Sequence, residues 1–259
     1  MGIEVFKKHL REKRAIKIAT GIENTNLEHV AKIARAAQSA KASAVEIISN
    51  KEVYETVRKN TKLPIIVSSI HPFEILQAVQ WGVDGVQIGN YSELYKKGRK
   101  FSAEQVYDVI LETMGLINKY NVYICVTIPA SLDTQEQVDL IKKLEYLGVN
   151  AIQAEGYRKS TTKPNHIIES ANVSIHNMTE LSQMTNMPVL VSCAMNETGL
   201  KVAFDNGANG VAVDYAVNKL DSEASMQAVI MEMVKSVFHR NSLNKELIKS
   251  SRELTSYYL

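Results

Sequence analysis

The chain has 259 residues, of which 45% are hydrophobic and 22% are charged, and its formal net charge at pH 7 is +2. These values are typical of one water-soluble α/β domain with a sizeable core, and the small net charge argues against a nucleic-acid-binding protein. No run of 18 apolar residues is present and charge begins at Glu4, so we expect neither a membrane span nor a secretory signal. The basic run at 7–14 is expected to form the solvated face of a helix.

Short β-rich runs alternate with helical patterns along the whole chain. The predicted strands are 14–20, 43–49, 64–68, 84–89, 122–128, 150–155, 188–192 and 209–214. The segments between them carry helix signals. Pro72 opens one helix, Asp133 and Glu136 form a capping box for another, and Gly82 and Gly148 follow the last turns of two helices.

An internal repeat indicates how the strands are arranged. LPIIVS at 63–68 matches MPVLVS at 187–192, and WGVDGV at 81–86 matches NGANGV at 206–211. The third and fourth strands therefore recur as the seventh and eighth, as expected for a barrel made of two four-unit halves. An open doubly wound sheet would need a G-x-G-x-x-G turn after the first strand, which is absent. We predict an α/β fold, a closed (β/α)8 TIM barrel.

The C-terminal segment lies beyond the eighth predicted unit. We treat 1–259 as a single domain, with the barrel at about 14–240 and a helical extension at about 241–259. Apolar residues at helical spacing mark this extension: Leu243, Leu247, Ile248 and Leu254. The segment is expected either to cover the barrel or to meet a partner subunit in a homo-oligomer.

Strand alternation predicts an unusually polar barrel interior. If the branched residues face the helices, the intervening residues point inward. The inward set is Lys17, Glu46, Ser68, Gln87, Thr127, Gln153, Glu155, Ser192 and Asp214. Barrel interiors are usually filled by apolar side chains, so these groups need either a mutual hydrogen-bond network or a ligand.

Lys17, Glu46 and Gln87 are the candidate catalytic residues within this interior. Lys17 and Glu46 lie on neighbouring strands and can form an ion pair that satisfies itself. Alternatively, the amine serves as an acid, a base or an imine-forming nucleophile that Glu46 tunes. Glu155 and Asp214, at strand ends, could be an acid and a base or the N-caps of the following helices.

Nothing in the sequence identifies a metal or another cofactor. The histidines show neither HxxxH nor HxH spacing, and Cys125 and Cys193 form no CxxC pair and fall in predicted strands. No metal site is expected, the cysteines are expected to be reduced core residues, and any cofactor is unknown.

Five motifs resemble, in order, a family called hypothetical chloroplast reading frame twenty-three. They are VSSIHP at 67–72, IGNYSELYKKGRKFS at 88–102, VTIP at 126–129, IQAEG at 152–156 and AVNKL at 216–220. The resemblance implies an aldolase-type barrel without an established activity, located in the plastid stroma or, for a cyanobacterial chain, in the cytoplasm. This chain has Ala130 where the family often has His, Cys193-Ala194 where it often has Ser-Gly, and Asp214-Tyr215 where it often has Gly-Ser.

An anion is expected on the strand-four side of the mouth. Asp214 places negative charge where a phosphate nest would need open glycine backbone. The repeat aligns Asp214 with Gly89, so Gly89, Asn90 and Arg99 are the candidate anion contacts. The full substrate-binding set is Ser68, Gly89, Asn90, Arg99, Thr127, Gln153 and Glu155.

Two classes of function remain open from the sequence. The first is a metal-independent enzyme of lyase or isomerase type that acts on a small anionic metabolite. The second is a barrel that binds a ligand or a protein without turnover. An enzyme predicts an open cavity that reaches Lys17, whereas a non-catalytic barrel predicts that mutual hydrogen bonds close off Lys17, Glu46 and Gln87. Neither nucleic acid nor a membrane is an expected partner.

Overall fold

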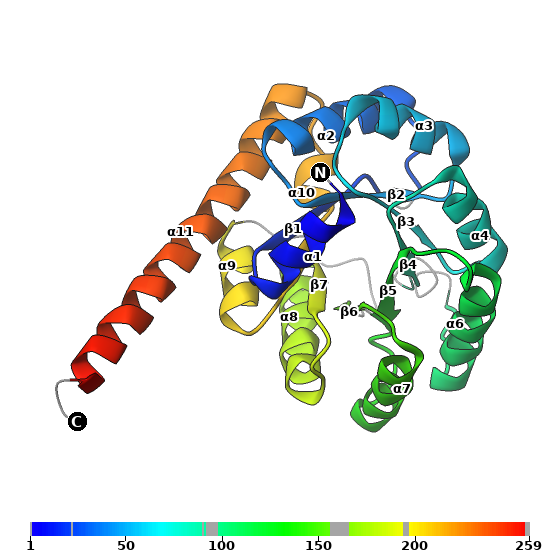
Figure 1. Ribbon diagram of the computed structural model, residues 1–259. Coiled ribbons are helices and arrows are strands. Elements are labelled where there is room, and N and C mark those ends of the chain that lie inside the picture. The colour runs from blue at the N-terminus through cyan, green and yellow to red at the C-terminus, as the bar shows by residue number, and fades with distance from the viewer. Residues whose placement is uncertain are drawn as a thin grey trace.

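The computed structural model describes residues 2–21, 23–89, 91, 98–155, 166–193 and 197–256. Eight parallel strands pair in chain order from β1 to β8, and β8 pairs back onto β1, so the barrel is closed. The helices surround it (Figure 1). This arrangement confirms the predicted TIM barrel and places β3 and β4 opposite β7 and β8, as the repeat indicated.

All eight predicted strands are present, with boundaries that agree to within one residue. The strands are β1 Ala15–Ala19, β2 Ala44–Ile48, β3 Ile65–Ser69, β4 Gly85–Ile88, β5 Tyr123–Ile128, β6 Ala151–Ala154, β7 Val189–Cys193 and β8 Gly210–Val213. Branched residues such as Ile16, Ile18 and Val45 are fully buried in the core shared with the helices. Their alternate neighbours therefore face the barrel axis, as predicted.

The described helices carry the caps that the sequence indicated. They are α1 Ile3–Arg11, α2 Leu27–Ser39, α3 Lys51–Asn60, α4 Pro72–Trp81, α6 Ala103–Ile117, α7 Thr134–Leu147, α8 His166–Met184, α9 Glu197–Asp205, α10 Tyr215–Asn218 and α11 Glu223–Ser256. Pro72 opens α4, and Asp133 and Glu136 form the capping box of α7. Gly82 and Gly148 end α4 and α7 in the left-handed conformation.

Helix α1 closes the N-terminal end of the barrel, across which it lies in Figure 1. Phe6 and Leu10 are buried with Tyr123 and Leu190, and the rings of Phe6 and Tyr123 meet edge to face at 5.5 Å. Basic residues of α1, such as Arg11, remain exposed, as predicted. Because apolar side chains fill this end, we expect a ligand to approach from the C-terminal end of the strands.

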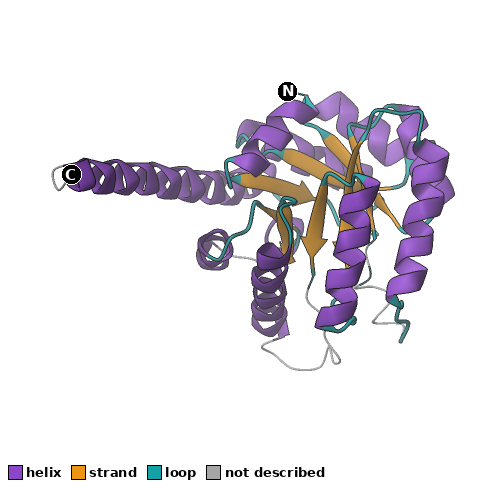
Figure 2. Cartoon of the chain, turned by 60° about the horizontal axis from the view of Figure 1, so that its bottom comes forward, coloured by secondary structure: helices purple, strands orange, loops and turns teal. Residues whose placement is uncertain are grey.

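Helix α11 contains the predicted C-terminal helical segment. It is one continuous helix from Glu223 to Ser256, so the extension continues the last helix of the barrel rather than forming a separate element. Figures 1 and 2 show its C-terminal half running past the barrel. Arg240 ties α11 to α9. Its Nε lies 2.5 Å from Oδ1 of Asp205, and its guanidinium donates to the carbonyl oxygen of Phe204. Within the described ranges, no helix has the length and apolar content needed to cross a bilayer.

Candidate active site

The middle of the barrel holds a cluster built around Lys17. Nζ of Lys17 forms an ion pair with Glu46 and donates hydrogen bonds to Oε1 of Gln87 at 3.1 Å and Oε1 of Gln153 at 2.9 Å. Lys17 is only 1% exposed. These contacts confirm that the four side chains point inward and meet near the barrel axis. The ammonium group thus makes two hydrogen bonds and one ion pair.

A column of hydrogen bonds links this cluster to the C-terminal rim. Nε2 of Gln87 donates to Oγ1 of Thr127 at 2.8 Å, and Oγ1 of Thr127 donates to the carbonyl oxygen of Gly89 at 3.3 Å. Oγ of Ser68 donates to the same carbonyl at 3.4 Å. The predicted residues of β3, β4 and β5 are thus brought together across neighbouring strands.

The ion pair between Lys17 and Glu46 lies in the buried interior, where removing both charges from water costs free energy. The Glu46 oxygen that lies against Lys17 has no hydrogen bond of good geometry within the described residues, so the pair depends on charge attraction. Such a buried pair contributes little net stability, yet removing one partner leaves the other charge uncompensated. The Cys125 thiol lies in the same layer, and burial raises its pKa to about 12, which keeps it protonated at neutral pH. It is a free, buried cysteine, as predicted.

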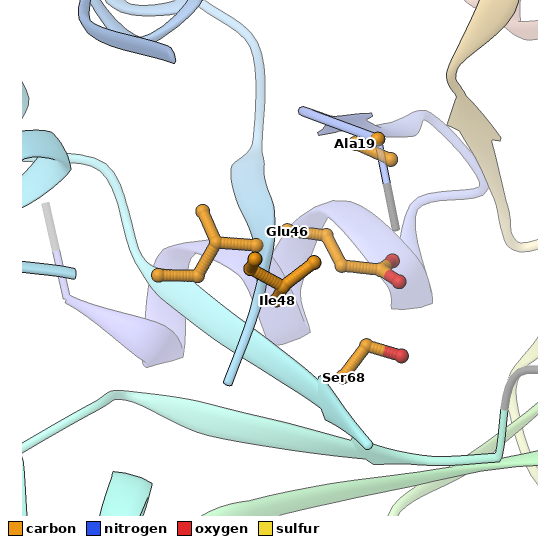
Figure 3. Close-up of a pocket in the computed structure, with 6 residues that line it drawn as sticks. Ala19, Glu46, Ile48 and Ser68 are labelled. Carbon is orange, nitrogen blue, oxygen red and sulfur yellow. The ribbon is translucent and has the colours of Figure 1, made fainter. Parts of the chain in front are cut away.

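A small hollow opens at the mouth between β1, β2 and β3. Glu46 and Ser68 line it together with Ala19, Gly21, Ile47 and Ile48, and its volume of about 10 Å³ is close to the room that one water molecule needs. Figure 3 shows the Glu46 carboxylate and the Ser68 hydroxyl pointing into the same space. Lys17 does not line this hollow. Among the described residues, no hollow therefore reaches Lys17, whereas an enzyme was expected to show one that does. Glu46 is the member of the cluster that borders the hollow, although it is only 6% exposed.

The strand-four end differs from the open backbone that the sequence indicated. The N–H of Gly89 donates to the carbonyl oxygen of Ser69 at 3.1 Å, so it is not available to an anion. Gly89 has φ +105°, and a Cβ added there would lie 2.7 Å from Cε2 of Tyr91 and 3.0 Å from Cβ of Thr127. The glycine is needed because the Tyr91 ring occupies this space. Asn90 lies outside the described residues, and Arg99 is exposed.

Tyr91 lies beside the candidate site, and the sequence analysis did not single it out. It is 1% exposed, and its ring packs against Phe101 with centroids 5.4 Å apart. Burial raises its pKa well above the usual range of a phenol, and the Glu155 carboxylate raises it further. Strand alternation could not identify Tyr91, because the chain leaves the strand at Gly89 before reaching it.

At the C-terminal end of β8, a hydrogen bond from Asn218 fixes the carboxylate of Asp214. Nδ2 of Asn218 donates to Oδ1 of Asp214 at 2.6 Å and to the carbonyl oxygen of Ala19 at 2.7 Å. Asp214 occupies the N-cap position of α10, but its side chain makes no capping hydrogen bond. Glu155 is also not an N-cap of α8, which begins at His166; Glu155 is buried, and its carbonyl accepts from Asn177.

The described part of the chain contains no group of three or more His, Cys, Asp or Glu side chains arranged to hold a metal ion. The side chains of the candidate site offer carboxylate, ammonium, amide and hydroxyl groups, which can transfer protons and form hydrogen bonds.

Comparisons with known proteins identify relatives across nearly the whole chain. The model of a family described as a protein of unknown function (DUF561) matches residues 3–243. The uncharacterized protein ycf23 of Cyanidium caldarium is 31% identical over 231 residues, covering 88% of this chain and 92% of the relative. The ycf23 protein of Cyanophora paradoxa is 31% identical over 227 residues, covering 86% and 93%. These relatives are plastid-encoded, in keeping with a plastid protein.

Solved structures share the architecture. A 3-hexulose-6-phosphate synthase from Salmonella typhimurium superposes with a TM-score of 0.64, covering 87% of this chain and 99% of that one, at 12% sequence identity. At this identity the likeness shows the fold alone.

Proposed function

This chain belongs to the DUF561 family, whose function is unknown, and from that premise we propose that it is a metal-independent enzyme of lyase or isomerase type. The substrate is a small anionic metabolite that binds at the C-terminal mouth of the barrel. One observation carries the proposal: the Glu46 carboxylate borders a small hollow beside Ser68 and forms an ion pair with the buried Lys17. A carboxylate placed between solvent and a fixed cation is suited to accept and return a proton.

In this proposal, Lys17 acts through Glu46. Its ammonium group forms an ion pair with Glu46 and hydrogen bonds with Gln87 and Gln153, and Lys17 does not line the hollow. An imine-forming lysine needs a neutral amine with access to a carbonyl group. The geometry therefore favours a positioning role for Lys17, with Gln87 and Gln153 fixing its direction.

The anionic group of the substrate is placed on the strand-four side of the mouth. Because the N–H of Gly89 is used within the barrel, Arg99 and Asn90 remain as the proposed contacts. Charge-assisted hydrogen bonds are worth about 1.5–3 kcal/mol, so Arg99→Ala should weaken binding at least about tenfold. Asp214→Gly should leave this binding intact or permit a second phosphate to bind. A phosphate compound that binds Arg99→Ala as tightly as the native chain would refute this placement.

The test of the proposed reaction is hydrogen exchange. Glycolaldehyde phosphate, dihydroxyacetone phosphate and ribulose 5-phosphate are incubated with the protein in D2O, and loss of the C–H signal next to the carbonyl is followed by proton NMR. We expect exchange with the native chain and a loss of about 10²–10⁴-fold in Glu46→Gln, since general base catalysis contributes that much. Glu112→Gln, an exposed change on α6, is the matched control. Absence of exchange with every compound would refute the proposed reaction.

The closed Lys17 cluster favours a second candidate, a barrel that binds its ligand without turnover. Mutual contacts among Lys17, Glu46 and Gln87 were the feature expected of that class. This function predicts that one of the same compounds raises the unfolding temperature while no carbon-bound hydrogen exchanges. Thermal shift and exchange measured on one sample separate the two candidates.

We place the protein in the plastid stroma, or in the cytoplasm of a cyanobacterium, on the basis of its plastid-encoded relatives. Fractionation of isolated plastids tests this location: the protein should be recovered with stromal markers. Recovery with thylakoid or envelope membranes would contradict it.

A further inference from the structure

The hollow between β1, β2 and β3 has the size and the lining of a site for one water molecule. Its volume of about 10 Å³ is close to the room that one water needs and is too small for the carbon chain of a metabolite. The Glu46 carboxylate and the Ser68 hydroxyl line it, and Figure 3 shows both groups pointing into it. A buried water needs at least two polar partners, and these two side chains supply them.

The Glu46 carboxylate calls for a hydrogen-bond donor besides Lys17. Glu46 is buried and its charge is balanced by Lys17, but its Oε2 accepts no hydrogen bond of good geometry from any described residue. An ionised carboxylate can accept about four hydrogen bonds, and buried polar groups are normally bonded to protein or to ordered water. A water molecule in the hollow would supply such a donor without displacing Lys17.

The Ser68 hydroxyl would set the orientation of this water. The hydroxyl donates its own hydrogen to the carbonyl oxygen of Gly89, with 3.4 Å between the two oxygens, so Oγ keeps lone pairs for another donor. A water between Glu46 and Ser68 therefore meets two acceptors and gives one hydrogen to each. Its own lone pairs are then left for the open side of the hollow, where they can take a proton from a carbon atom at the rim.

We propose that the hollow binds one ordered water molecule and that this water carries the proton between the substrate and Glu46. The relay rests on the proposed function and deepens it. Because the reacting carbon of a metabolite does not fit into the hollow, Glu46 acts on it through one water, which is within the reach of a general base. Ser68 is a positioning residue in this relay.

The exchange step balances without any reactant other than the solvent. The water oxygen takes the proton of the C–H bond next to the carbonyl while one O–H proton of the same water passes to the Glu46 carboxylate. The C–H electron pair becomes the C=C bond of the enolate, and the carbonyl π pair moves to oxygen. In D2O the reverse steps return a deuteron to the carbon, so the net change is one hydrogen replaced by one deuterium.

The experiment removes the room for the water and its second acceptor separately. Ala19→Val fills the hollow, which Ala19 lines, and leaves Glu46 and Ser68 in place. Ser68→Ala keeps the room but removes the hydroxyl. Ser192→Val is the matched control, because in the internal repeat Ser192 holds on β7 the position that Ser68 holds on β3, and it does not line the hollow.

Two measurements are made on the full-length proteins. Crystal structures of the native chain and of Ala19→Val show whether a water is bound. Exchange of glycolaldehyde phosphate, dihydroxyacetone phosphate and ribulose 5-phosphate in D2O is followed for the native chain and the three variants, and the unfolding temperature of each is measured.

We expect the native crystal structure to show a water within hydrogen-bond distance of both the Glu46 carboxylate and Oγ of Ser68, and Ala19→Val to lack it. Ala19→Val should lower the exchange rate constant at least about a hundredfold, because it disconnects the general base. Ser68→Ala should lower it about tenfold, as loss of one hydrogen bond does, with KM changed less than about threefold. Ser192→Val should exchange at the native rate.

Each adverse result has a definite meaning. A native crystal structure without a water between Glu46 and Ser68 overturns the inference, whatever the activity. If Ala19→Val exchanges within about threefold of the native rate, the water does not carry the proton and the proposed function stands. If the native chain exchanges none of the three compounds, the relay fails together with the proposed reaction, and the crystal structure still decides the water site. If Ala19→Val unfolds well below the native temperature, Ser68→Ala decides, and a native rate constant in that variant overturns the relay.

Discussion

Gly89→Ala tests the packing at the rim most directly. The native φ of +105° is strained for any residue with a Cβ, at a cost of about 1–3 kcal/mol. The added methyl group would also lie 2.7 Å from the Tyr91 ring and 3.0 Å from Cβ of Thr127, both buried, and such overpacking costs about 1–3 kcal/mol. We expect a total loss of roughly 2–6 kcal/mol in the free energy of unfolding.

Thermal and urea unfolding followed by circular dichroism measure this loss. For a domain of this size, each kcal/mol corresponds to roughly 2–4 °C, so the unfolding temperature should fall by at least about 4 °C. Substitutions at two other glycines separate the backbone cost from the steric cost. Gly148 has φ +77°, and a Cβ added there would have no atom within 4 Å, so Gly148→Ala has only the backbone cost. Gly115→Ala, inside α6 with open space around it, should stabilise by about 0.5–1 kcal/mol.

A double-mutant cycle isolates the contact with the ring. Gly89→Ala measured in a Tyr91→Ala background should lose the steric cost that comes from the ring and exceed the cost of Gly148→Ala only by the remaining contact with Thr127. If Gly89→Ala in the native background is no more destabilising than Gly148→Ala, the Tyr91 ring does not occupy the inward position.

Three further outcomes are expected. Lys17→Met should destabilise by about 3–5 kcal/mol in chemical denaturation because it leaves Glu46 uncompensated, and adding Glu46→Leu should recover most of that loss; no recovery would show that the two charges are not coupled. Burial holds the pKa of His9 at about 4, so the unfolded chain, with its pKa near 6.5, binds the proton first: stability should be full above about pH 6.5 and decline toward pH 4, and less so in His9→Gln. Deleting residues 243–259 should leave the unfolding temperature of the barrel unchanged, since this part of α11 runs past it, and a lower particle mass by light scattering would assign the segment to a partner subunit.

Much of the site could be predicted because side-chain direction within a strand is a local property. Once a residue is in a strand, its neighbours at i ± 2 share its face. That rule placed Lys17, Glu46, Gln87 and Gln153 in the interior, where their contacts with one another now confirm it. The same locality explains the correct strand boundaries and helix caps, which depend on residues within one turn of each other.

Alternation alone could not establish which interior groups have partners and which face open space. The bond between Lys17 and Gln153 joins residues 136 apart in sequence and exists only because the barrel closes. Closure of the barrel surrounds the ammonium group with Glu46, Gln87 and Gln153 and leaves Glu46 as the member that borders the hollow. The sequence thus identified the polar residues of the interior, and the tertiary structure decided which of them border the hollow.

At the C-terminal end of β4, too, the sequence predicted one part of the structure and the tertiary packing decided another. A glycine at 89 indicated positive φ or a close approach, and the repeat suggested open backbone for an anion. Both glycine properties are present, but the close approach is made by Tyr91, and the N–H of Gly89 is bonded to Ser69. Where a side chain lies after the chain leaves a regular strand depends on the turn and on the packing around it. The sequence by itself therefore determined the barrel and its polar interior, whereas only the folded chain decided that a tyrosine covers the rim.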